Sequence, residues 1–182
     1  MTSSAMVSSA YFLLLVPLFI YMRYRQAKKH NRFVYLRTEM SLACLFFYTN
    51  LLLYLTVFPN RFSAARDQVS VNLMPFHSIY QNLHAYHHGY PNLVFLNLAG
   101  NILLFIPLGF FLYHTFRTMR WQKAVLAGFL FSVLIEVLQW VFSQSGIITR
   151  SSDIDDIILN TLGTALGCIG YQMYRRRKEN TS

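Results

Sequence analysis

The stretch RSSDIDDIILNTLGTALG, residues Arg150 to Gly167, places three aspartates directly in front of an apolar segment. Asp153, Asp155 and Asp156 fall within four positions. Acidic residues before an apolar run are typical of a helix N-terminus, where a side-chain oxygen caps free N–H groups and the helix dipole favours negative charge. Because capping accounts for only one or two of the aspartates, the stretch also indicates a polar functional site.

The composition predicts that this stretch lies in a lipid bilayer. The chain has 182 residues, of which 54% are hydrophobic and 13% charged, and its mean hydropathy is +0.34. A helix needs about 20 apolar residues to cross the hydrocarbon core of a membrane. Five segments come close to that length: Met6–Tyr24, Met40–Phe58, Leu93–Phe116, Ala124–Phe142 and Ile154–Tyr174. We therefore expect an all-α, polytopic membrane bundle of five transmembrane helices.

The positions of the basic residues predict the orientation of the bundle. Most of the 16 Lys and Arg residues flank the first and third connections or form the C-terminal tail. Since cytoplasmic loops carry an excess of Lys and Arg, the N-terminus is expected outside and the C-terminus inside. The net charge of +9 is then explained by topology and anionic cytoplasmic lipid, and no nucleic-acid partner is expected.

The chain length favours one membrane domain without an additional soluble domain. Residues 1–39 are expected to form the first span and a basic cytoplasmic connection. Residues 40–174 would form a four-helix membrane domain, and residues 175–182 a basic cytoplasmic tail.

Polar or small side chains recur along one face of each of the last three spans. Residues three or four positions apart share a helix face. The stripes comprise Asn97 and Asn101 in the third span, Gly128, Ser132, Glu136, Gln139 and Ser143 in the fourth, and Asp153, Asp156, Asn160, Gly163 and Gly167 in the fifth. With the predicted topology, the acidic and amide side chains of all three stripes lie in the outer half of the bilayer. We expect them to converge on one site.

Of the residues in these stripes, Glu136 gives the strongest indication of a functional site. An ionised side chain at a helix centre costs roughly 2.5–3.5 kcal/mol and almost always faces a partner or water. Arg150, in the following loop, is the nearest candidate partner by sequence. Asp155 lies about 100° round the helix from Asp156, so we expect it to be an interface charge outside the site. The candidate ligand-binding residues are Asn97, Asn101, Glu136, Gln139, Arg150, Asp153, Asp156 and Asn160.

Several of these residues have structural alternatives. Gly163 and Gly167 have the spacing of a helix-packing surface, and amide or hydroxyl side chains within spans can form hydrogen bonds between helices. The outer connection also contains His77, His84, His87 and His88, whose spacing would suit zinc on a helix, although an interfacial loop rich in aromatic residues and histidine is the commoner pattern. No GxSxG, HExxH or Walker-type motif is present. We expect no metal and no cofactor.

Four segments resemble the VanZ-like family in order and comparable spacing. They are NLMPF at 72–76, LAGNILLFIPLGFFL at 98–112, LIEVLQ at 134–139 and the opening stretch at 150–167. The resemblance runs from about Met40 onward. It implies a bacterial multi-pass cell-membrane protein, similar to proteins associated with low-level resistance to teicoplanin and related glycopeptides.

The leading hypothesis is that an outer-leaflet polar site engages a cell-wall precursor or another lipid head group. Arg150 would meet a phosphate as a bidentate fork, while Glu136 and Gln139 would hold it in place and Asn97 and Asn101 would exchange hydrogen bonds with the ligand. Asp153 and Asp156 would cap their helix or bind a bridging cation.

The alternative hypothesis is a Mg²⁺-dependent membrane enzyme acting on a polyprenyl-phosphate-type lipid. Asp153, Asp156 and Asn160 share a helix face and offer oxygen ligands of the type that Mg²⁺ combines with substrate phosphates. A small transporter has less support, because the repeated halves and broken helices common in such folds are missing.

Overall fold

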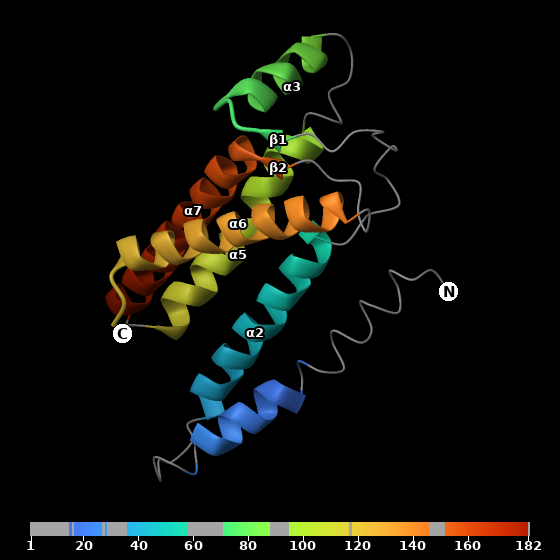
Figure 1. Ribbon diagram of the computed structural model, residues 1–182. Helices are drawn as coiled ribbons and strands as arrows, with labels where there is room; N and C mark the ends of the chain where they lie inside the picture. Colours follow the sequence, from blue (N-terminus) through green and yellow to red (C-terminus); the bar gives the residue numbers. More distant parts are fainter. Residues whose placement is uncertain are drawn as a thin grey trace.

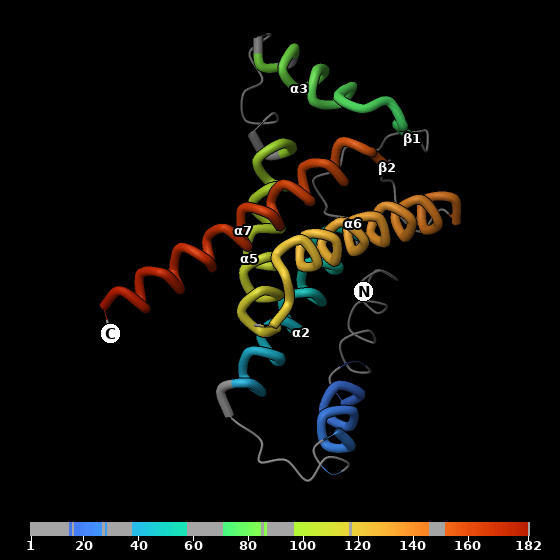
Figure 2. The backbone as a smooth tube through the Cα atoms, turned by 90° about the vertical axis from the view of Figure 1, so that its left-hand side faces the viewer, coloured from blue at the N-terminus to red at the C-terminus, as the bar shows by residue number. Residues whose placement is uncertain are grey.

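The computed structural model describes residues 15, 17–26, 28, 36–57, 71–87, 95–116, 118–145 and 152–181. These residues are mostly helical (Figures 1 and 2), and residues 17–26 form a helix near the N-terminus. The elements after it are α2 (Leu36–Val57), β1 (Val71–Asn72), α3 (His77–His87), the π-helix η1 (Phe95–Ala99), α5 (Gly100–Thr115), α6 (Trp121–Gln144), β2 (Ser152–Asp153) and α7 (Ile154–Asn180).

Three of the described helices are long and apolar enough to cross a membrane. They are Thr38–Val57, Asn97–Thr115 and Trp121–Gln144, which correspond to the second, third and fourth predicted spans. The predicted fifth span corresponds to α7, which begins at Ile154 as expected and continues to Asn180, but α7 is not among these three. Much of the first predicted span lies outside the described residues. The total of five spans and the orientation of the termini remain predictions.

The distribution of side chains on α6 is the reverse of that on a helix in a water-soluble protein. Its exposed side includes Leu126, Leu130, Leu134, Val137 and Trp140. Its buried residues are Ala124, Gly128, Ser132, Ile135, Glu136, Gln139 and Ser143. Large apolar side chains on the outside and polar ones toward neighbouring helices are expected when the solvent is lipid.

Small residues allow α5 and α7 to pack with their backbones in contact. A Cβ atom on Gly167 would collide with the Ile106 carbonyl oxygen, and one on Gly109 would collide with the Thr164 carbonyl oxygen. A Cβ on Gly163 would collide with the Ile102 carbonyl oxygen. These contacts confirm the helix-packing interpretation of Gly163 and Gly167. Figure 1 shows α7 running beside α5 with α6 passing across, and Figure 2, turned by 90°, shows α7 crossing α5.

An apolar core joins α2 to α5 and α6. Its buried members are Leu45, Leu52, Val57, Phe105, Leu108 and Ile135. Two hydrogen bonds reinforce it: the Tyr48 hydroxyl donates to the Leu104 carbonyl oxygen at 2.6 Å, and the Gln139 amide donates to the Thr56 carbonyl oxygen at 2.7 Å.

A two-stranded parallel sheet fixes the segment before α3 against the start of α7. Val71 pairs with Ser152, and Asn72 pairs with Asp153. This pairing places β1 and α3 beside the N-terminal end of α7 (Figure 1). Two short segments about 80 residues apart in the chain thereby meet at one end of the helical bundle.

Candidate functional site

The N-terminus of α7 is capped by Asp153. This residue has an extended backbone, and its side chain accepts a hydrogen bond from the Asp155 N–H at 2.9 Å, so the predicted capping role is confirmed. The same carboxylate accepts hydrogen bonds from the Ser78 hydroxyl and, at 3.1 Å, from the Asn72 amide. Asp153 therefore both starts α7 and holds the segment between β1 and α3.

The expectation that Asp155 is only an interface charge is wrong. Asp155 is 1% exposed, and its carboxylate accepts three backbone hydrogen bonds. The donors are the N–H groups of Phe76 at 2.5 Å, Ser78 at 2.9 Å and Ile79 at 3.1 Å. The prediction failed because these donors are main-chain groups of a distant loop, which a helical projection does not contain. We call this arrangement the Asp155 latch.

Phe76 has a positive φ of 65°, the backbone conformation that non-glycine residues seldom adopt. This conformation accompanies the donation of its N–H to Asp155. The backbone of the NLMPF segment is thus shaped around a carboxylate at the start of α7.

Glu136 is 6% exposed and lies against the start of α7. Its Oε2 atom accepts a hydrogen bond from the Asp153 N–H at 2.9 Å, and its carbonyl oxygen accepts one from the Ser152 hydroxyl at 2.7 Å. Glu136 and the N-terminus of α7, which belong to two of the stripes expected to converge, are therefore in contact. A carboxylate inside the bundle is stabilised by a main-chain donor at the end of a helix, where the helix dipole also favours negative charge.

Asp156 and Asn160 extend the polar contacts along α7 to both neighbouring helices. Asp156 accepts a hydrogen bond from the Asn101 amide of α5. One turn further, the Asn160 amide donates to the Ser132 hydroxyl of α6 at 2.8 Å. Asn160 is 3% exposed, and its Oδ1 atom has no hydrogen-bond donor among the described residues. This oxygen is a buried acceptor that a ligand group could satisfy.

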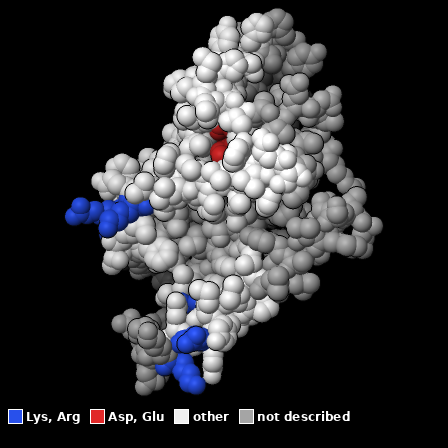
Figure 3. All heavy atoms as spheres, in the orientation of Figure 1, with Lys and Arg blue, Asp and Glu red and all other residues white. Residues whose placement is uncertain are grey.

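The structure thus brings together five predicted site residues from α5, α6, β2 and α7. They are Asn101, Glu136, Asp153, Asp156 and Asn160, and we call them the polar cluster. On the face drawn in Figure 3, acidic atoms form one small spot below α3, whereas Lys and Arg lie at the left and bottom edges. The acidic and basic groups of this face are therefore well separated.

Two predicted site residues make hydrogen bonds outside the polar cluster. Asn97 is exposed and donates to the Asn82 side chain of α3 at 3.1 Å. It lies in the π-helix η1, and its contact is to α3, whereas Asn101 contacts Asp156 of α7. Gln139 faces α2 through its bond to Thr56. These contacts favour the interhelical hydrogen-bonding alternative for both residues.

Arg150, the predicted partner of Glu136, lies outside the described residues. The described part of the chain also contains no group of three or more His, Cys, Asp or Glu side chains arranged to hold a metal ion. His77 instead contacts the Gln81 amide at 2.8 Å within α3.

Sequence reasoning missed Asn72, Ser78 and Ser132 as partners of the cluster. Ser132 was within a predicted stripe but was not assigned to the site. Asn72 and Ser78 lie beside the NLMPF segment, and their only signal was their proximity to that motif.

The match to known families agrees with this geometry. A family model described as VanZ/LLP1 matches residues 45–175. The chain belongs to the VanZ/LLP1 family. No curated protein and no solved structure matches it. The VanZ/LLP1 region contains α5, α6, β2 and most of α7, so the whole polar cluster falls within it.

A pair of variants separates the two asparagines of this VanZ/LLP1 chain. Asn101→Ala removes the amide that contacts Asp156 and should cost about 1–2 kcal/mol in free energy of unfolding. Asn97→Ala removes an exposed contact and should cost less than about 0.5 kcal/mol. Thermal unfolding of both purified proteins in one detergent measures the difference. Equal losses would contradict the separate assignments of Asn97 and Asn101.

Proposed function

We propose that this VanZ/LLP1 membrane protein engages the head group of a cell-wall precursor or another membrane lipid at the polar cluster. This engagement would lower the sensitivity of a bacterial cell to teicoplanin-type glycopeptides. The observation that carries the proposal is the meeting of Asn101, Glu136, Asp153 and Asp156 from separate segments at one end of an apolar bundle. Ionisable residues within membrane bundles are rare and mark substrate or ion sites.

The predicted topology places the polar cluster in the outer half of the bilayer. Glycopeptides act on cell-wall precursors outside the membrane, so site and target share a side. In the proposal, Arg150 supplies the bidentate contact to a phosphate, and the neighbouring carboxylates hold its guanidinium in place. The buried Asn160 Oδ1 atom would accept a hydrogen bond from a hydroxyl or amide of the ligand.

The Mg²⁺-dependent enzyme has less support from the contacts. Mg²⁺ binds through carboxylate oxygens and water, whereas the Asp155 carboxylate is directed at three N–H groups and the Asp153 carboxylate at Ser78, Asn72 and its own helix. Asp156, the third aspartate, is engaged by the Asn101 amide. Two of the three aspartates are therefore engaged in holding the fold together, which leaves fewer oxygen ligands for Mg²⁺.

The test is teicoplanin susceptibility of cells that express the wild type, Glu136→Gln or Arg150→Ala. Glutamine keeps an oxygen that can accept from the Asp153 N–H but removes the charge, so the fold should persist. We expect each variant to return the inhibitory concentration to that of cells without the protein. Membrane abundance is measured in the same cells.

The matched control is Glu39→Gln, which removes a carboxylate from the ion pair with Arg23 near the start of α2. It should leave protection unchanged, since a partly exposed ion pair contributes little to stability. If the cluster variants protect as well as the wild type at equal abundance, the proposed function is wrong. If protection falls only in proportion to abundance, the cluster serves packing.

A further inference from the structure

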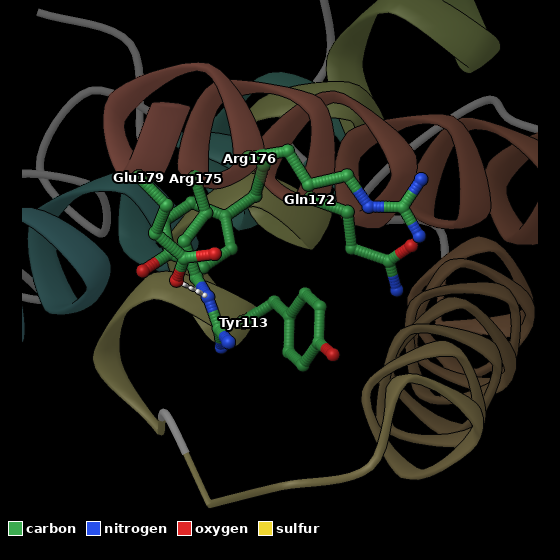
Figure 4. Close-up of a pocket in the computed structure, with 6 residues that line it drawn as sticks. Tyr113, Gln172, Arg175, Arg176 and Glu179 are labelled. Atoms are coloured by element: carbon green, nitrogen blue, oxygen red, sulfur yellow. Dashed lines mark hydrogen bonds and ion pairs between the residues drawn. The ribbon is translucent and has the colours of Figure 1, made fainter. Parts of the chain in front are cut away.

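At the far end of α5 and α7 lies a second polar site, separate from the polar cluster and open to the surface at the exposed Arg175, Arg176 and Glu179. It is a cavity of about 290 Å³ (Figure 4). Its lining residues are Tyr113, Tyr171, Gln172, Arg175, Arg176 and Glu179. Tyr113 belongs to the last turn of α5 and the others to the C-terminal part of α7.

Aromatic rings form one wall of this cavity. Tyr171 is 4% exposed and packs edge-on against Tyr113, with 5.6 Å between the ring centroids. Figure 4 shows the Tyr113 ring across the cavity from α7, with its hydroxyl directed toward the side on which Gln172 and Arg176 lie. The cavity therefore presents a ring, a hydroxyl and an amide close to a guanidinium.

The charges of the lining favour a ligand with one negative charge. Arg175 donates to the Glu179 carboxylate at 2.9 Å, so these two groups largely neutralise each other. Arg176 then contributes the net positive charge of the lining. A phosphodiester carries one negative charge, and a guanidinium is well suited to contact its oxygens.

The position of the cavity points to a lipid as the source of that phosphodiester. The apolar part of α7 ends at Tyr174, and Arg175 begins the basic segment. This is the level at which tyrosine and arginine meet lipid head groups. Basic pockets between membrane helices on the cytoplasmic side are known to bind anionic head groups. The volume of the cavity, about 290 Å³, is close to the lower limit of the roughly 300–1,000 Å³ range of ligand pockets. This is enough for a head group while the acyl chains stay in the bilayer.

We propose that this cavity binds the head group of an anionic phospholipid of the inner leaflet. The Arg176 guanidinium contacts the phosphate, and the Gln172 amide and Tyr113 hydroxyl contact the polar group attached to it. This site is independent of the proposed outer-leaflet function, because the two lie at opposite ends of α7.

The test counts phosphatidylglycerol molecules bound to the purified full-length protein by native mass spectrometry from mixed micelles. Phosphatidylcholine is the lipid control, because it has the same phosphodiester but no net charge. We expect phosphatidylglycerol to bind more tightly, and Arg176→Gln to weaken its binding about fivefold to tenfold.

Arg177→Gln is the matched variant, since it removes the same charge from the next position of α7 but from a residue that does not line the cavity. It should weaken binding less than about twofold. Equal losses in the two variants would mean a diffuse charge effect and would overturn the proposal. Inorganic phosphate is added in a separate titration. If it binds alone and displaces the lipid at similar concentration, the site recognises a soluble phosphate and the lipid proposal is wrong.

Discussion

Gly167→Ala is expected to destabilise the bundle by about 3 kcal/mol, the upper part of the usual range for overpacking. The new methyl group would collide with the Ile106 carbonyl oxygen and would also crowd the Phe110 N–H. Both are main-chain groups of α5, so neither can rotate away as the end of a flexible side chain would. The helices must separate, which loses van der Waals contact along the whole α5–α7 interface.

Gly170→Ala supplies the control for this experiment. It lies on the same helix, and a Cβ atom there would have nothing within 4 Å. Because alanine loses less backbone entropy than glycine, this change should stabilise α7 by roughly 0.5–1 kcal/mol. Thermal unfolding in one detergent, followed by helical circular dichroism, compares the two. If both substitutions shift the midpoint in the same direction, the close packing of α5 and α7 is wrong.

Asp155→Asn is expected to have a comparably large effect, about 3 kcal/mol, by opening the Asp155 latch. The carboxylate offers two oxygens to three N–H donors. Asparagine has one oxygen and directs an NH₂ group at a remaining donor, which leaves buried N–H groups unsatisfied. The loss should be concentrated in the segment that contains Phe76, Ser78 and Ile79.

Amide hydrogen exchange at those three positions measures the opening directly. Their exchange should accelerate by about a hundredfold, the factor that corresponds to roughly 3 kcal/mol. Asp156→Asn is the control, because its side chain faces Asn101 and asparagine keeps an acceptor oxygen there. Similar acceleration in both variants, or none in Asp155→Asn, would refute the latch.

The helices of this bundle were largely predictable from hydropathy and helix periodicity. Apolar runs located α2, α6 and the continuous helix formed by η1 and α5 to within a few residues, and α7 begins at the predicted Ile154. The sharp start of α7 was predictable because capping by an aspartate is a local property. The three- and four-residue periodicity also identified the helix faces on which Asn101 contacts Asp156 and Asn160 contacts Ser132.

What could not be predicted depends on main-chain groups and on a helix outside the apolar runs. Asn97 contacts Asn82 of α3 instead of the polar cluster, and the helix α3 that supplies this partner lies in a connection that hydropathy did not identify. The Asp155 latch uses N–H donors that every residue except proline carries, so its partners have no signature in the sequence. Helical projection alone assigned Asp155 to the wrong environment.

The order in which the chain is synthesised determines when the contacts of the polar cluster can form. Asn101, Ser132 and Glu136 emerge from the ribosome before α7, yet their described partners are on α7 and β2. During synthesis these polar groups precede their partners on β2 and α7, and the N–H groups of Phe76, Ser78 and Ile79 in the outer connection likewise precede Asp155. Translation of α7 therefore completes the cluster and the latch in one step, so biogenesis itself couples the closing of the bundle to the formation of its site.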